Sequence, residues 1–422
     1  MRSRTPQRST FMKKRFLILA LAISLVLQSF LAISCNTERP NETEATEKAT
    51  EAPTEKVTDE ETEEATDKTT EKATEPQQPE DPEEPEEPKV PEEPEEIDED
   101  ELLLEDLLEM KIDMRADEEG NFKVLILSDI QGSNSHIDIP ESVRANIRNI
   151  VNREQPDLVI FNGDNCHEIK GEENLREYLT NMTLYLEQNK IPWAHVYGNH
   201  DDVGGISKER QSEIYAEFKY CISEVGSVSG VGNYVIPIYS HDGSKILYNV
   251  WCLDSHGYTK LDDKINVTLQ NGVYFKGTYD YIKPDQIEWY LKSSKLLEEY
   301  NGAPIPAIMA FHIPLQETGE AWMVKDSAKL EWTGEKHENG GFSAINSGLF
   351  AAVLERGDVK AIVNGHDHVN DFMVKYHGVM LCYSSTVSTM SYYRENLLGA
   401  RVFSFSRDEN APITTYMSYL NK

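Results

Sequence analysis

The pattern of apolar and polar positions changes near residue 101. From residue 36 to that point apolar positions are scarce, and after it short apolar runs alternate with more polar stretches. Three apolar runs predict strands, because strands covered on both faces lack the apolar–polar alternation of half-exposed ones. They are "FKVLIL" (122–127), "DLVIF" (157–161) and "PWAHVY" (192–197).

Stripes of apolar side chains at helical spacing lie between these runs and predict two helices. The stripes are Val143, Ile147, Ile150 and Val151 in the first, and Leu175, Tyr178, Leu179, Met182, Tyr185 and Leu186 in the second. A strand–helix alternation of this kind predicts a βαβαβ start and an α/β fold.

The rest of the chain is less regular. Residues 205–280 contain one strand-like run, "KILYNVWCLD" (245–254), and "KPDQIEWYLKSSKLLEEY" (283–300) predicts a helix with Pro284 near its start. Two further strands are predicted at "IPAIMAF" and "VKAIVN". We expect "VMLCYSS", "ARVFSFS" and "TTYMSYL" to form a second, largely antiparallel sheet, so that residues 101–422 make one two-layered α/β unit.

Residues 1–35 have the pattern of a secretory signal peptide. Basic residues up to Arg15 precede an apolar run over 16–27, followed by small residues. The segment ends in "LAISC", which resembles a bacterial lipobox, although Ala32 stands where that motif prefers leucine. We expect a lipidated Cys35 that anchors the protein to the membrane. An uncleaved signal anchor is the alternative, and both place the remainder outside the cytoplasm.

Residues 36–100 form an acidic linker of threonine, glutamate and proline. Over residues 41–100 there are 26 acidic residues against five lysines, within a formal net charge of −33 for the whole chain. Such a composition cannot bury a core, so we expect a disordered tether. No basic stripe occurs anywhere, which argues against binding a nucleic acid backbone.

Four cysteines remain once Cys35 is set aside, namely Cys166, Cys221, Cys252 and Cys382. They are scattered, with no CxxC pair, so neither a zinc knuckle nor a disulfide framework is indicated. We expect buried free thiols, with a disulfide as the alternative in an oxidising compartment.

Five predicted strands end in clusters of carboxylates, amides and imidazoles. The residues are Asp129 and Gln131, Asp164 and His167, Asn199 with His200 and Asp201, His312, and His366 with His368. A single aspartate after a strand is usually a turn or helix cap, but sites in open α/β sheets are built at the carboxyl ends of strands. These ligand types suit divalent metals such as Zn, Mn or Fe, and their number is enough for two ions.

The motifs resemble those of the calcineurin-like metallophosphoesterases. That family has D-x-H, G-D-x-x, G-N-H-D/E, a lone histidine and G-H-x-H in order, and this chain has "SDIQ", "NGDNCH", "GNHDD", "FHIP" and "GHDH". The resemblance spans about residues 122–405. "KPDQIEWYL", "FHIPLQE" and "GHDHVNDF" look closest to the purple-acid-phosphatase-like branch that includes Dcr2-type phosphatases. The resemblance implies a mixed β-sandwich flanked by helices, the metallophosphoesterase fold.

The resemblance also implies roles for individual residues. Asp164 would bridge two metals; Asp129 and His368 would hold the first, and Asn199, His312 and His366 the second. His200 would be the transition-state stabiliser or proton donor, and Asp201 would orient it.

One position departs from the family pattern. Gln131 stands where the D-x-H motif has its histidine, and glutamine is a poor ligand. His167 stands three residues after Asp164, where purple acid phosphatases place a tyrosine ligand. We expect His167 to bind the first metal, with water or the Gln131 oxygen as the alternative.

The expected function is that of an extracytoplasmic phosphatase with two divalent or trivalent metal ions (Fe, Mn or Zn). It would hydrolyse a phosphorylated small molecule, a phosphate monoester, by metal-hydroxide attack. Two alternatives stay open: a phosphodiesterase acting on nucleotides or lipid head groups, and a non-catalytic lipoprotein that binds envelope polymer. His256 and Tyr258 are candidates for lining the pocket.

Overall fold

The structure, a computed structural model, describes residues 98–259, 266–268, 274–276, 279–408 and 410–421. The predictions for residues 1–35 and for the linker up to residue 97 lie outside the described residues. None of the helices in the described ranges is long and apolar enough to cross a membrane.

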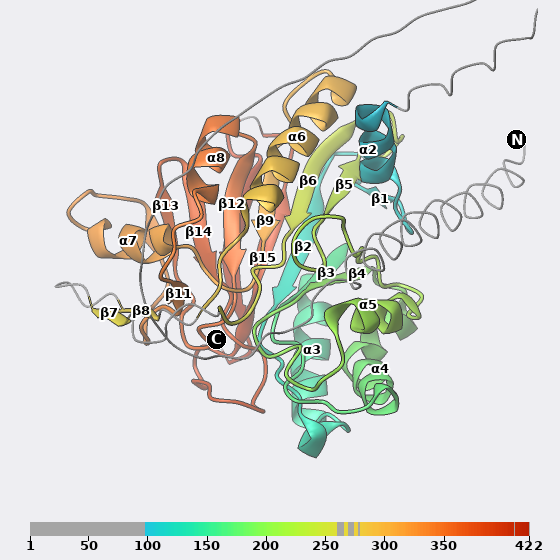
Figure 1. The fold of residues 1–422 in the computed structure, drawn as a ribbon, viewed down its shortest axis with the longest axis vertical. Coiled ribbons are helices and arrows are strands. Elements are labelled where there is room, and N and C mark those ends of the chain that lie inside the picture. The colour runs from blue at the N-terminus through green and yellow to red at the C-terminus, as the bar shows by residue number, and fades with distance from the viewer. Residues whose placement is uncertain (1–97, 260–265, 269–273, 277–278, 409, 422) are drawn as a thin grey trace, which may run out of the picture. The chain divides into compact units, whose positions relative to one another are not determined.

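The described ranges contain eight helical segments, and Figure 1 labels α2 to α8. The helices are α2 (Glu99–Leu108), η1 (Asn134–His136), α3 (Glu141–Glu154), α4 (Glu172–Asn189), α5 (Lys208–Ala216), α6 (Pro284–Asn301), α7 (Gln316–Val324) and α8 (Leu349–Arg356). Asp98 caps α2 by accepting from the backbone N–H groups of Asp100 and Glu101. The predicted helix over 283–300 is confirmed as α6, with Pro284 in its first turn.

The first sheet has the strand order β16-β15-β2-β3-β4. Its strands are β2 (Phe122–Leu127), β3 (Leu158–Asn162), β4 (Trp193–Val196), β15 (Gly399–Phe405) and β16 (Ile413–Tyr419). β2, β3 and β4 are parallel neighbours joined by α3 and α4, which confirms the predicted βαβαβ start. β15 adds antiparallel to β2, and β16 antiparallel to β15.

The second sheet has the order β1-β5-β6-β9-β12-β14-β13-β10. Its strands are β1 (Met114–Arg115), β5 (Tyr234–Tyr239), β6 (Ile246–Cys252), β9 (Ala307–Ala310), β10 (Trp332–Thr333), β12 (Val359–Asn364), β13 (Met373–Tyr376) and β14 (Val379–Tyr383). β6, β9, β12 and β14 are parallel neighbours. A small third sheet joins β11 (Phe342–Ser343), β8 (Tyr274–Lys276) and β7 (Asn266–Thr268).

The prediction that the C-terminal strands form a sheet of their own is wrong. β14 lies parallel to β12 inside the second sheet, whereas β15 and β16 extend the first. Apolar runs that are buried on both faces identify strands but carry no information on which partner each one pairs with.

Two mixed sheets therefore face each other with helices on their outer faces, which confirms the predicted sandwich (Figure 1). Side chains alternate between layers: Val124 and Ile126 lie in the core between the sheets, whereas Leu125 and Leu127 pack under α3 and α4. A third core, which includes Trp251 and Tyr290, fills the space between the second sheet and α6, α7 and α8.

The region 205–280 holds elements that the sequence pattern did not reveal. α5 and β5 both lie there, and β5 contains Pro237 within an otherwise apolar run. Proline in a strand pattern argues against a central strand, and β5 is next to the two-residue edge strand β1. All four cysteines of the described residues are buried free thiols, as predicted.

Candidate metal centre

The polar clusters predicted from the sequence all follow the carboxyl ends of strands. Asp129, Asp164 and Asn199 come after β2, β3 and β4 of the first sheet. His312 comes after β9 and His366 after β12 of the second sheet. The parallel direction of these strands brings the five loops to the same end of the two sheets.

Backbone hydrogen bonds tie these loops to one another. The N–H of Asp129 donates to the carbonyl of Gly163 over 3.1 Å, and the N–H of Gly365 donates to the carbonyl of His312 over 3.2 Å. Across the sheets, the Thr386 hydroxyl donates to the carbonyl of Asp129 over 2.9 Å. The clusters are therefore held by the scaffold before any ligand binds.

Four of the site residues have left-handed backbone conformations, with φ of 59° at Asp129, 50° at Gln131, 50° at Asp164 and 73° at His366. Such values are uncommon outside glycine and cluster at functional sites. Gly198 is needed for a different reason, because a Cβ there would lie 2.2 Å from Oδ1 of Asp164. The local backbone thus brings side chains together at a conformational cost.

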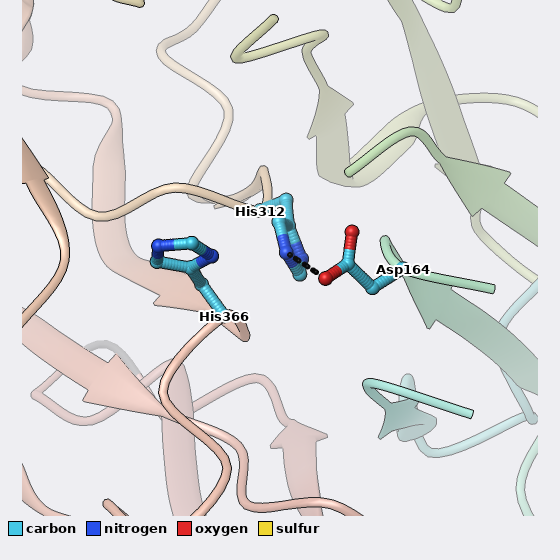
Figure 2. Close-up of side chains that lie close together, drawn as sticks. All are labelled: Asp164, His312 and His366. Carbon is cyan, nitrogen blue, oxygen red and sulfur yellow. Dashed lines mark ion pairs between the residues drawn. The ribbon is translucent and has the colours of Figure 1, made fainter. Parts of the chain in front are cut away.

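Asp164, His312 and His366 form a buried group whose ligand atoms all lie within 4.8 Å of one another (Figure 2). Nδ1 of His312 bonds to the carbonyl of Asn162 over 2.9 Å, which leaves Nε2 pointing at Oδ2 of Asp164, 3.2 Å away. That Nε2 and Oδ2 of Asp164 form an ion pair, whereas the buried Oδ1 of Asn199 has no hydrogen-bond partner. A buried polar atom without a partner is uncommon in folded proteins, and an amide oxygen is of a metal-binding type.

A second group lies on the other side of Asp129. Nε2 of His368 is 3.4 Å from Oδ1 of Asp129, and its Nδ1 bonds to the carbonyl of Tyr392 over 2.9 Å. Nε2 of Gln131 is 2.9 Å from Oδ2 of Asp164 and 3.1 Å from Nε2 of His368. The Gln131 side chain thus contacts both Asp164 and His368.

His167 takes another position. Its ring meets that of His200 edge-on, with centroids 4.4 Å apart, and its backbone N–H donates to the carbonyl of Gly132. The expectation that His167 binds the first metal, with water or the Gln131 oxygen as the alternative, stays a prediction; the contacts of Gln131 are made by its NH₂ group, which is a donor and not a metal ligand.

His200 lies at the partly exposed edge of the group. Its backbone N–H donates to Oδ1 of Asp164 over 2.9 Å, and its ring Nε2 is 3.9 Å from Oδ2 of the same residue. This geometry holds the imidazole beside the group without making it part of the buried cluster.

The expectation that Asp201 orients the His200 ring stays a prediction, and the contacts in this structure support a different role. Nδ1 of His200 has no hydrogen-bond partner. The Asp201 carboxylate instead accepts from the backbone N–H of Cys166 over 2.9 Å and from that of Gly198 over 2.6 Å. Asp201 is buried, and its carboxylate joins the loop after β3 to the loop after β4.

Electrostatics favour a cation in this cluster. Burial raises the pKa of Asp129 well above its usual value. Burial alone would also raise the pKa of Asp164 and lower that of His312. The attraction between the two groups is stronger than this effect of burial, so the pKa of Asp164 falls and that of His312 rises to about 10. The negative charge of Asp164 and its contact with His312 are thus the main cause that holds a proton on this buried imidazole. A metal cation would take the place of that proton, so the residues fit divalent metals.

Three aromatic residues lie beside the site, and the sequence predicted only one of them. Tyr279 packs edge-on against the ring of His366, and Tyr392 stacks on the ring of His368. Tyr258, a candidate from the sequence, accepts a hydrogen bond from Nδ2 of Asn199 over 3.0 Å. Its companion candidate His256 bonds to Gln286 instead. No motif in the sequence points to Tyr279 or Tyr392.

Comparison with known proteins adds an independent finding. A family model described as calcineurin-like phosphoesterase matches residues 122–370. Probable inactive purple acid phosphatase 14 of Arabidopsis thaliana is 29% identical over 310 residues, which cover 66% of this chain and 73% of the plant protein. Phosphatase DCR2 of Saccharomyces cerevisiae is 28% identical over 310 residues, covering 64% of this chain and 48% of the yeast protein. A dimetal phosphatase from Danio rerio aligns with 70% of this chain and 98% of its own, at 13% identity and a TM-score of 0.40.

Proposed function

The chain belongs to the calcineurin-like phosphoesterase family, and on that premise we propose that it is a phosphatase that hydrolyses phosphate monoesters with two bound metal ions. The observation that carries the proposal is the buried convergence of Asp164, His312 and His366, together with the buried Oδ1 of Asn199, which has no hydrogen-bond partner.

The proposed ligands divide between two metal positions. Asp164 would bridge them, Asp129 and His368 would hold the first, and Asn199, His312 and His366 would hold the second. The short distances from Asp164 to His312 and from Asp129 to His368 support this division. His167 would complete the first position, with water or the Gln131 oxygen as the alternative. The donor set of carboxylate, amide oxygen and imidazole suits Fe, Mn or Zn.

Two bound cations would supply Lewis-acid chemistry, which neutralises charge on the phosphoryl oxygens and lowers the pKa of the attacking water. The protein contributes position and proton transfer. Asp164 is held in place by the backbone N–H of His200 and by Gln131. His200 has a partly exposed ring beside Asp164, where it can donate a proton to the leaving oxygen of the ester.

We also propose that the enzyme works outside the cytoplasm, anchored to the membrane through a lipidated Cys35. The basic, apolar and small-residue regions of residues 1–35 support this, together with the acidic linker that follows. The substrate would then be a phosphorylated small molecule that is accessible outside the cell.

The test is activity on a panel of phosphorylated metabolites after metal removal and reconstitution with Mn, Zn or Fe. We expect monoesters to be hydrolysed faster than diesters; the reverse order would identify a phosphodiesterase. His200→Ala should keep its metals and lose about 10²–10⁴ in rate on esters with poor leaving groups. Loss of metal in that variant, with normal turnover once metal is restored, would remove His200 from the chemistry.

A non-catalytic role is the second candidate, because three relatives carry the word inactive in their names. A protein that binds two metals yet hydrolyses nothing in the panel would favour that role. A protein that binds no metal and hydrolyses nothing in the panel would also favour the non-catalytic role and would contradict the enzymatic proposal.

A further inference from the structure

The side chain of Asn199 raises a question that its proposed ligand role does not answer. Its Oδ1 is buried and has no hydrogen-bond partner, whereas its Nδ2 donates to the hydroxyl of Tyr258 over 3.0 Å. An amide that presents its oxygen to a metal must satisfy its NH₂ group elsewhere, since a buried donor without an acceptor is costly. Tyr258 provides that acceptor.

The ring of Tyr258 is itself held from two sides. It stacks on the ring of Tyr279 at a centroid distance of 5.7 Å and an interplanar angle of 27°. The backbone next to it is tied to the Tyr279 segment, since the N–H of Asp280 donates to the carbonyl of Gly257 over 3.1 Å. The hydroxyl therefore stays in a fixed place although 52% of the residue is exposed.

The stacked pair reaches a second proposed ligand. The ring of Tyr279 meets the ring of His366 edge-on, with centroids 4.5 Å apart. One end of the pair thus contacts Asn199 and the other contacts His366, both of them proposed ligands of the second metal.

We propose that Tyr258 is a positioning residue for the second metal position: its hydroxyl accepts from Nδ2 of Asn199 and so holds Oδ1 of Asn199 toward the metal. The inference rests on the metal assignment in the proposed function, but it does not require that the protein be catalytically active. Residues that hold a metal ligand from outside commonly change metal affinity by about 10–100-fold when removed.

The test is Mn²⁺ titration of the full chain, purified in detergent and stripped with a chelator, followed by calorimetry. Tyr258→Phe keeps the stacked ring and removes the hydroxyl. We expect one of the two Mn²⁺ sites to weaken about tenfold and the other to stay as in the wild type. Tyr300→Phe is the matched control, because Tyr300 is an exposed tyrosine on α6 and should leave both sites unchanged.

A second variant, Tyr258→Leu, and a double-mutant cycle with Asn199→Ala test whether the hydroxyl of Tyr258 acts through Asn199. If Tyr258→Leu weakens Mn²⁺ binding and Tyr258→Phe does not, the hydroxyl has no role and the proposal is overturned. In an Asn199→Ala background, Tyr258→Phe should have no further effect, because the group that it positions is gone. An undiminished effect in that background would overturn the proposal as well.

The outcome is separable from that of the proposed function. If the wild type hydrolyses no phosphate ester but the Mn²⁺ titrations behave as described, Tyr258 keeps its role and the enzymatic proposal fails. If the wild type is active and Tyr258→Phe binds both Mn²⁺ ions normally, the enzymatic proposal stands and the inference on Tyr258 fails.

Discussion

Asp201→Asn separates two roles for the carboxylate next to His200. In this structure the Asp201 oxygens accept from the backbone N–H groups of Cys166 and Gly198. Cys166 lies two residues after the proposed bridging Asp164, and Gly198 directly precedes Asn199. The substitution should therefore disturb the two loops that carry metal ligands, with little influence on the His200 ring.

The magnitude follows from the hydrogen bonds. An asparagine at 201 has one acceptor oxygen and one NH₂ group, so either the Cys166 or the Gly198 N–H faces another donor. A buried donor left without a partner costs about 1–3 kcal/mol, and removing a buried charge next to Asp164 offsets a part of this. We expect the free energy of unfolding to fall by about 2 kcal/mol. Asp202→Asn, the same change at the exposed neighbouring residue, should stay within about 0.5 kcal/mol.

The assay is urea unfolding of the metal-free protein, joined to a double-mutant cycle in kcat with His200→Ala. If Asp201 acts through the loops, Asp201→Asn lowers kcat by the same factor with or without His200. A rate loss that vanishes in the His200→Ala background, together with an unchanged free energy of unfolding, would show that Asp201 works through the ring and would refute the reasoning.

Three further predictions follow from buried groups. Asp164→Asn should weaken both metal positions and remove most activity, because one carboxylate serves both; two tightly held metals with full activity would disprove the bridge. His195 is buried and burial lowers its pKa to about 3 from an ordinary 6.5, so its neutral form stabilises the fold fully above pH 6.5 and progressively less below it. Between pH 7 and pH 5, unfolding free energy should fall by about 2 kcal/mol more in the wild type than in His195→Gln, and parallel pH curves would contradict this. Lys208→Met removes the partner of the buried Asp254, whose two oxygens lie 3.0 Å from Nζ, and should cost about 3–5 kcal/mol in urea unfolding, with partial recovery on adding Asp254→Asn.

The parts of the fold that depend on local pattern were predictable. β2, β3, β4, α3 and α4 follow one another along the chain with clear apolar runs and stripes, and neighbours in sequence became neighbours in space. The sheet that β15 joins could not be predicted, because its partner β2 lies far away in the sequence. An apolar strand can pair with either sheet, and which one it joins depends on the assembled core. β5 was missed since Pro237 interrupts its pattern.

The candidate site divides in the same way. The type and order of the ligand residues could be predicted, because side chains of metal-binding types stand directly after the predicted strands. The roles of Asp201 and His167 could not, since the direction of a side chain in a loop depends on which backbone donors come near it. The contact between Asn199 and Tyr258 joins loops that are far apart in sequence and has no local signal.

The proposed ligands come from both sheets: Asp129, Asp164 and Asn199 follow strands of one, and His312, His366 and His368 follow a pair of adjacent strands in the other. A cation bound by ligands from both sheets would link one sheet of the sandwich to the other. Such a metal binds only the folded state, in which the two sheets lie together. It would therefore raise the free energy of unfolding by about 4 kcal/mol at a free metal concentration a thousand times the dissociation constant. The metal supply of the compartment would then set how long the two sheets stay together, as well as how fast the site turns over.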